Sequence, residues 1–175
     1  MAGRDQVPVA TFEPPFDDEI NFLRNSYTPQ QIKVFYALRQ VTEERHRDSG
    51  TPIEKVIEDW LKNDLPDHGL KNSPNDLAEF TAACKSLFPG LEDWHKVPEE
   101  WFGPAKSGQY TNQIANDSGM FRDQKIFQTL VNRVKRGDRV FAVIGEGHVV
   151  VQEPALVKEF GTPKLKLSGL PSSHP

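Results

Sequence analysis

The sequence has a single cysteine, Cys84, so no disulfide can form within the chain. Long apolar runs are also missing. None approaches the roughly 18 residues of a membrane span, and no basic-then-apolar signal peptide opens the chain. The 21 basic and 25 acidic side chains are mixed along the chain, without the concentrated basic face of a nucleic-acid binder. These absences predict a soluble, cytoplasmic protein that binds neither nucleic acid nor a membrane.

The 175 residues suffice for one domain with its own core. Thr28-Pro29, Thr51-Pro52 and Ser73-Pro74 each place a hydroxyl N-cap before a proline at the first helical position. Gln31 and Glu54 complete capping boxes in the first two. Apolar residues at helical spacing predict helices at about 17–24, 29–47, 52–63, 74–87, 119–136 and 154–160.

Two short β-branched runs, Val7–Phe12 and Val140–Ile144, indicate strands buried on both faces, as in a parallel sheet. The alternating run Lys164–Leu167 is typical of an edge strand. Two buried strands are too few for a stable sheet. We therefore expect either a homo-oligomer that completes the sheet or a missing N-terminal strand.

The predicted fold is a helix-rich α/β domain over residues 1–170, with a small, mostly parallel sheet. A helical insertion over 28–117 forms a large crossover between the two main strands. Residues 171–175 are expected to form a frayed tail, because chain termini without anchoring contacts are poorly ordered.

The turn Gly145-Glu146-Gly147-His148 follows the second predicted strand. Ligands bind beyond the carboxyl ends of strands in open α/β sheets, so His148 is a candidate metal ligand or general base there. A phosphate cradle is disfavoured because Val150 occupies the place of the third glycine. Glu13 follows the first predicted strand, and parallel neighbours would bring it to the same edge as His148. The alternatives are a plain surface turn and a solvated or helix-capping Glu13.

Arg122-Asp123 lies near the start of the helix that leads to the second predicted strand. Arg122 is expected to clamp an anionic substrate, to fix Glu13 through a bidentate pair, or to form an ordinary surface ion pair. Three other histidines, His46, His68 and His95, are scattered in polar surroundings and are predicted to be surface residues.

Arg122-Asp123, the helix after it and the run Arg139–His148 resemble the C-terminal signature of the TIKI/TraB/ChaN-like superfamily, which includes erythromycin-esterase-like proteins. Thr11-Phe12-Glu13-Pro14 is similar to the family's second strand with its acidic residue. The helical middle of the chain matches no motif, and the family's earlier glycine–histidine element is missing. The resemblance implies a metal-dependent hydrolase or protease, or haem binding as in the ChaN branch.

The leading hypothesis is a metal-dependent hydrolase-like domain that acts on a small-molecule or peptide substrate. His148 and Glu13 would hold a divalent ion (Mn, Zn or Co) that generates hydroxide, and Arg122 would stabilise negative charge. Asp123, Gly145 and Gly147 would help to bind the ligand. Because a zinc-type site needs about three protein ligands, we expect weak metal binding and weak activity.

Two alternatives come from different functional classes. The first is a module that binds haem or another planar ligand through His148 and an aromatic wall formed by Trp94, Trp101 or Tyr110. The second is a non-catalytic structural protein.

Overall fold

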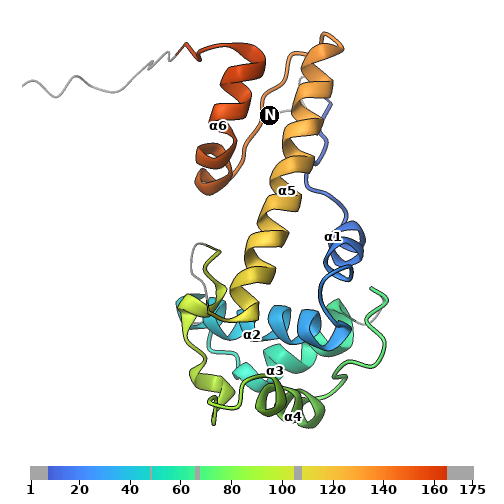
Figure 1. Cartoon of the computed structure of the whole chain (residues 1–175), viewed down its shortest axis with the longest axis vertical. Helices are drawn as coiled ribbons and strands as arrows, with labels where there is room; N and C mark the ends of the chain where they lie inside the picture. Colours follow the sequence, from blue (N-terminus) through green and yellow to red (C-terminus); the bar gives the residue numbers. More distant parts are fainter. Residues whose placement is uncertain (1–7, 48, 66–67, 105–107, 165–175) are drawn as a thin grey trace, which may run out of the picture. The chain divides into compact units, whose positions relative to one another are not determined.

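The computed structural model describes residues 8–47, 49–65, 68–104 and 108–164. The chain divides into two compact units: a helical unit, residues 13–122, and a terminal unit, residues 1–12 together with 123–175. Every regular element in the described ranges is a helix (Figure 1), so the prediction of an α/β fold with a parallel sheet is wrong.

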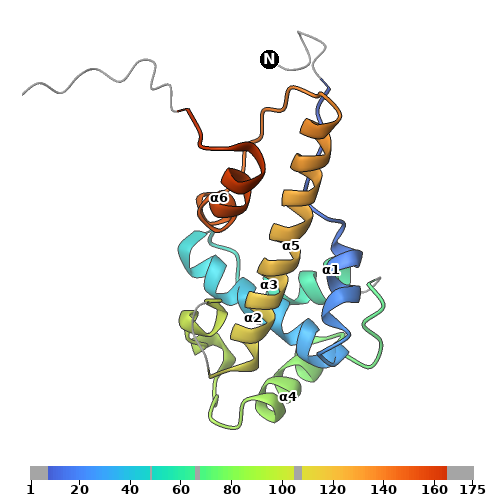
Figure 2. The ribbon, with the colours of Figure 1, turned by 45° about the horizontal axis from the view of Figure 1, so that its top comes forward.

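The helical unit is built around α2, Pro29–Arg47. Helices α3 and α4 pack against α2, and both views show them beside it (Figures 1 and 2). The unit's helices are α1 (Phe16–Leu23), α2, α3 (Ile53–Asp59), the π-helical turn η1 (Trp60–Asp64), α4 (Leu77–Leu87), the 3₁₀ turns η2 (Trp94–Lys96) and η3 (Glu99–Phe102), and the first half of α5 (Tyr110–Lys135).

Helix α2 is central because apolar residues occur on almost every side of it, and such a helix is stable only when it is buried. Val34 and Leu38 belong to a buried cluster that extends into α3 and α4. Ile32 and Phe35 belong to a second buried cluster, which extends into α1 and reaches Ile114 of α5. The core of the helical unit therefore lies on two sides of one helix.

The capping signals predict the start of α2 and, within one residue, the start of α3, but not the start of α4. The Gln31 amide donates to Thr28 Oγ1 at 3.2 Å and the Thr28 amide donates to Gln31 Oε1 at 3.0 Å, which confirms the capping box. Helix α3 has no side-chain cap, so the box predicted with Glu54 is wrong. Helix α4 is capped by Asp76, whose Oδ1 accepts from the Glu79 amide at 2.8 Å, and so begins three residues after the predicted start.

In the terminal unit, the second half of α5 and the helix α6, Glu146–Phe160, are the regular elements of the described residues. Gly137, at φ 90°, follows the end of α5 in the left-handed region that favours glycine, which is typical of a helix C-terminal stop. Helix α6 begins well before the predicted residue 154 and contains Pro154 in its interior.

Neither predicted main strand is present among the described residues, because neither has a neighbouring strand. No backbone–backbone hydrogen bond joins residues 139–144 to any other described residue. Residues 8–12 are likewise without regular structure. An isolated strand gains no ladder hydrogen bonds to offset the entropy lost on ordering. Val7, most of the predicted edge strand 164–167 and the predicted tail 171–175 lie outside the described residues, and the single-domain boundary stays a prediction.

Candidate functional site

Glu13 and Arg122 form a bidentate ion pair in the helical unit. Arg122 Nε and Nη2 each lie 3.0 Å from a Glu13 carboxylate oxygen. These hydrogen bonds raise the pKa of Arg122 despite its partial burial. Of the three roles expected for Arg122, the bidentate pair that fixes Glu13 is therefore the one whose geometry is present. An anionic substrate would have to displace Glu13 to reach the same guanidinium face.

A buried carboxylate, Glu19, joins three helices of the same unit. The Tyr36 hydroxyl of α2 donates to Glu19 Oε1 of α1, and the Ser118 hydroxyl of α5 donates to the same oxygen. All three side chains are buried. Burial and the neighbouring carboxylate raise the pKa of Tyr36 well above its ordinary value. Ser118 lies inside α5, where its hydroxyl joins this network.

His148 lies in the first turn of α6 and not at a strand end. Its Nδ1 is 2.7 Å from Asp123 Oδ1, and Gln152 Nε2 donates to the same oxygen at 2.8 Å. Asp123 on α5 thus fastens α6 within the terminal unit. Both glycines of the turn lack a positive φ. A Cβ at Gly147 would meet nothing within 4 Å, so the backbone there does not require glycine.

The predicted metal site lacks a complete set of donors. Among the described residues, no group of three or more His, Cys, Asp or Glu side chains is placed to hold a metal ion. Glu13 pairs with Arg122 in the helical unit, while His148 pairs with Asp123 in the terminal unit. The residues present do not fit a zinc-type centre, which needs about three protein ligands.

The aromatic residues suggested as a haem wall pack instead into the core of the helical unit. Trp94 is buried, with its ring edge-on to Phe80 at a centroid distance of 5.3 Å. Phe88 stacks on Tyr110 at 5.1 Å and packs against Trp101 at 5.0 Å. These rings therefore cover one another and present no open wall for a planar ligand.

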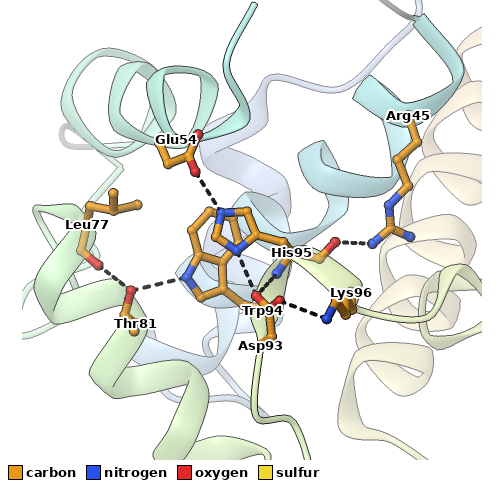
Figure 3. Close-up of polar contacts among 8 residues, drawn as sticks. All are labelled: Arg45, Glu54, Leu77, Thr81, Asp93, Trp94, His95 and Lys96. Carbon is orange, nitrogen blue, oxygen red and sulfur yellow. Dashed lines mark hydrogen bonds and ion pairs between the residues drawn. The ribbon is translucent and has the colours of Figure 1, made fainter.

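Sequence reasoning missed a polar cluster around His95 (Figure 3). His95 Nδ1 lies 2.7 Å from Asp93 Oδ1, and Nε2 lies 2.9 Å from Glu54 Oε1 on α3. The imidazole stacks on the Trp94 ring at a centroid distance of 3.7 Å. Partial burial lowers the pKa of His95, but the two carboxylate hydrogen bonds outweigh it and the net shift is upward.

The His95 cluster fastens the loop around η2 to neighbouring helices. Trp94 Nε1 donates to Thr81 Oγ1 of α4 at 3.1 Å. Arg45 of α2 donates from Nη2 to the His95 carbonyl at 2.5 Å (Figure 3). Its Nη1 donates to the Val97 carbonyl at 2.8 Å. With a carboxylate on each ring nitrogen, His95 has no lone pair free for a metal or for general-base work. We interpret the cluster as a structural clasp.

An open surface depression of about 320 Å³ lies where α4 begins, and the sequence predicts no function for the residues around it. Gln30, Asn72, Asn75 and Glu79 contribute polar side chains to its wall. Behind Asn75 lies Lys33 of α2, whose ammonium donates to Asn75 Oδ1 at 3.1 Å. A buried lysine is rare, and no sequence signal distinguishes Lys33 from the exposed lysines of the chain.

No protein-family model, curated protein or solved structure matches this chain. The resemblance to the TIKI/TraB/ChaN-like superfamily therefore stays a prediction, as do the hydrolase and haem hypotheses that rest on it. Within the described residues, no helix is long and apolar enough to cross a membrane.

Proposed function

We propose that this chain is a non-catalytic module that binds another polypeptide, and that the binding surface lies on the terminal unit. The observation that carries the proposal is the exposure of residues 139–144, here called the apolar segment. Phe141 is 92% exposed and Val143 is 76% exposed. Burying one such side chain stabilises a complex by about 1.5–3 kcal/mol.

The apolar segment continues into a second exposed group on α6. Val149, Val150 and Val151 are exposed there, and so is Phe160 at the other end of the helix. Several exposed apolar side chains in one unit favour a protein interface, whereas single exposed apolar residues are ordinary. The two groups belong to the same unit and follow each other in the chain.

The occupant that fits the apolar segment is an extended strand of another polypeptide. Residues 139–144 have no backbone–backbone hydrogen bond within the described chain, so their amides and carbonyls are available to a partner strand. β-Strand addition uses such groups for affinity and alternate side chains for specificity. Val140, Ala142 and Ile144 alternate with Phe141 and Val143, so the partner would cover apolar side chains on both faces.

A second copy of the chain is one source of that strand, as the sequence suggested with its homo-oligomer. A two-fold axis across an antiparallel pair would set Ala142 opposite Ala142, or Val143 opposite Val143, of the other copy. A different polypeptide would pair without this restriction. The proposal commits to a strand, and the experiment decides between these two sources.

Sedimentation velocity over a concentration series tests for the second copy. Fluorescence anisotropy with a capped, labelled peptide of alternating threonine and valine tests for a foreign strand. We expect association in at least one arm, loss of it in Val143→Lys, and slower amide exchange across residues 139–144 in the complex. Met120→Lys is the matched control, because Met120 is an exposed apolar residue of the helical unit. A chain that stays monomeric and leaves the peptide unbound would refute the proposed function.

A further inference from the structure

The first half of α6 contains residues that disfavour a helix. The run Val149–Val151 consists of β-branched side chains, which lose rotamer freedom in a helix and are enriched in strands. Gly147 lowers helix stability relative to alanine, although a Cβ there would meet nothing within 4 Å. Pro154 lies in the helix interior, where proline removes a backbone hydrogen bond and crowds the carbonyl four residues earlier. Residues 146–153 are therefore helical against the preference of their own sequence.

Polar contacts hold this part of α6 in its helical form. His148 Nδ1 and Gln152 Nε2 lie four residues apart on one face of the helix, and both reach Asp123 Oδ1, at 2.7 Å and 2.8 Å. Gln152 is the buried residue of α6, whereas Val149–Val151 are exposed. The helix therefore directs polar side chains toward α5 and valines toward solvent. A different conformation that buried these valines would gain free energy from the hydrophobic effect.

The same stretch of sequence has the pattern of a β-hairpin. The apolar residues 140–144 and the run His148–Gln152, with its three valines, are separated by Gly145-Glu146-Gly147. Three-residue hairpin loops are commonly a type I turn followed by a residue in the left-handed region, which favours glycine. Gly147 occupies that position of the loop. The hairpin therefore explains a glycine that the helical form does not require.

The loop length also determines which side chains would face one another. A three-residue loop sets Val143 opposite Val149 and Phe141 opposite Val151, and side-chain alternation places all four on one face. All four side chains are exposed in the helical form. The chain already reverses direction between residues 139–144 and α6 (Figure 1). Because a two-stranded hairpin is at best marginally stable alone and a third strand stabilises it, binding of another strand would favour the hairpin.

We propose that residues 140–152 form a β-hairpin when a partner strand binds. This inference rests on the proposed function, because the partner supplies the third strand. The apolar segment would be the middle strand, paired with the partner along one edge and with residues 148–152 along the other. Pro154 would become the first residue of a shorter α6, the position at which proline is favoured in a helix. Binding would break both contacts of Asp123, so this carboxylate restrains the free chain.

Two glycine variants of the full chain test the hairpin, with the capped, labelled peptide of alternating threonine and valine as the probe. Gly147→Ala stabilises the helix and strains the left-handed loop position, so we expect it to weaken peptide binding at least about tenfold. Gly145→Ala is the matched control. Gly145 has a φ of −64°, a Cβ there makes an ordinary contact with His148 at 3.9 Å, and the first loop position needs no positive φ. It should bind like the parent chain.

The restraint by Asp123 predicts a change in the opposite direction. Asp123→Ala removes the acceptor of His148 and Gln152, and we expect it to tighten peptide binding by about fivefold. Fluorescence anisotropy measures the affinities of all the variants. If the chain self-associates, sedimentation velocity measures the same order of affinities. Binding of Asp123→Ala that is no tighter than that of the parent chain would exclude the restraint.

Chemical shifts report the change of structure directly. The Cα and Cβ shifts of residues 149–151 should be helical in the free chain and strand-like in the complex, with a close Hα contact between residues 143 and 149. If the parent chain binds no strand, the proposed function is refuted and the hairpin with it. If it binds while residues 149–151 stay helical, or if Gly147→Ala binds as tightly as Gly145→Ala, the hairpin alone is wrong.

Discussion

The two units of this chain differ in whether their apolar side chains are buried or exposed. Among the described residues, all but two of the buried apolar side chains belong to the helical unit, the exceptions being Ile126 and Val131. In the part of the chain that the structure describes, all but two of the exposed large apolar side chains belong to the terminal unit, the exceptions being Phe22 and Met120. The helical unit buries most of its apolar side chains in its own core. The terminal unit leaves most of its own exposed, where another molecule can cover them. Composition already separates the units in part, because ten of the 14 valines belong to the terminal unit, whereas leucine and phenylalanine occur in both.

Amide hydrogen exchange should show the largest contrast between the units. Amides in the middle of α2 are expected to exchange only through global unfolding, since that helix lies between two buried clusters. Amides of residues 139–144 are expected to exchange at nearly the rate of an unfolded peptide, because no backbone partner protects them. Mass spectrometry of pepsin fragments from the monomeric chain would measure both. Strong protection of the amides of residues 139–144 in a monomer would contradict the expected contrast between the two units.

Truncating one phenylalanine in each unit gives the next largest effect. Phe80 is fully buried in the core beside Trp94, so Phe80→Ala should lower the free energy of unfolding by about 3–5 kcal/mol. Phe141 is almost fully exposed, so Phe141→Ala should change it by less than about 0.5 kcal/mol. Urea denaturation followed by circular dichroism checks both values. Similar losses in the two variants would show that Phe141 is packed in solution.

Removing the buried carboxylate of the helical unit should cost somewhat less. Glu19→Ala leaves the buried hydroxyls of Tyr36 and Ser118 without their acceptor, and we expect a loss of about 2–4 kcal/mol. Glu19→Gln keeps one acceptor oxygen and should recover part of that loss. Glu153→Ala, at an exposed position on α6, is the control and should change little. Equal unfolding midpoints for Glu19→Ala and Glu153→Ala would exclude a stabilising role for the network.

The smallest expected effect is the pH dependence of the His95 clasp. The pKa of His95 is raised above its unfolded value of about 6.5. The stability it contributes is therefore complete below about pH 6.5 and is lost as the pH rises through the folded pKa. The carboxyls of Glu54 and Asp93 have lowered pKa values, so their contribution is lost on acidification.

Thermal unfolding across this pH range should show the loss in the parent chain and a flatter profile in His95→Gln. His46→Gln is the control, because that ring is mostly exposed. The change of unfolding temperature with pH will be small, since the side chains of the clasp are in contact with solvent. An identical pH profile in His95→Gln would show that the clasp does not stabilise the fold.

Sequence reasoning succeeded where the signal was local. The start of α2 followed from Thr28, Pro29 and Gln31, which lie within four residues of one another. The capping box of α3 did not follow, because Glu54, the expected capping partner, bonds to His95, 41 residues further along the chain. The prediction of two strands was wrong for a related reason. A strand depends on its neighbours, and the apolar run at 140–144 specifies no neighbour.

The residues of the candidate site likewise differ in whether the sequence could predict their contacts. The pairing of Arg122 with Glu13 could be proposed because an arginine and a carboxylate attract each other wherever they meet. The burial of Lys33 could not be foreseen, because a lysine among apolar residues of a helix ordinarily extends its ammonium to solvent. Only the packing of α4 and its preceding loop against α2 encloses it.

The π-helical turn after α3 determines where this chain can gain or lose a residue. The Leu65 amide bonds to the Trp60 carbonyl five residues back, at 3.1 Å, so the turn holds one residue more than an α-helical turn. Deleting one of the exposed residues Lys62 or Asn63 would leave an ordinary helical turn. A single deletion inside α2 would rotate every later side chain by about 100° and pull one face of the helix out of the core. We therefore expect the fold to tolerate a single-residue deletion at the end of α3 and to lose stability on one inside α2.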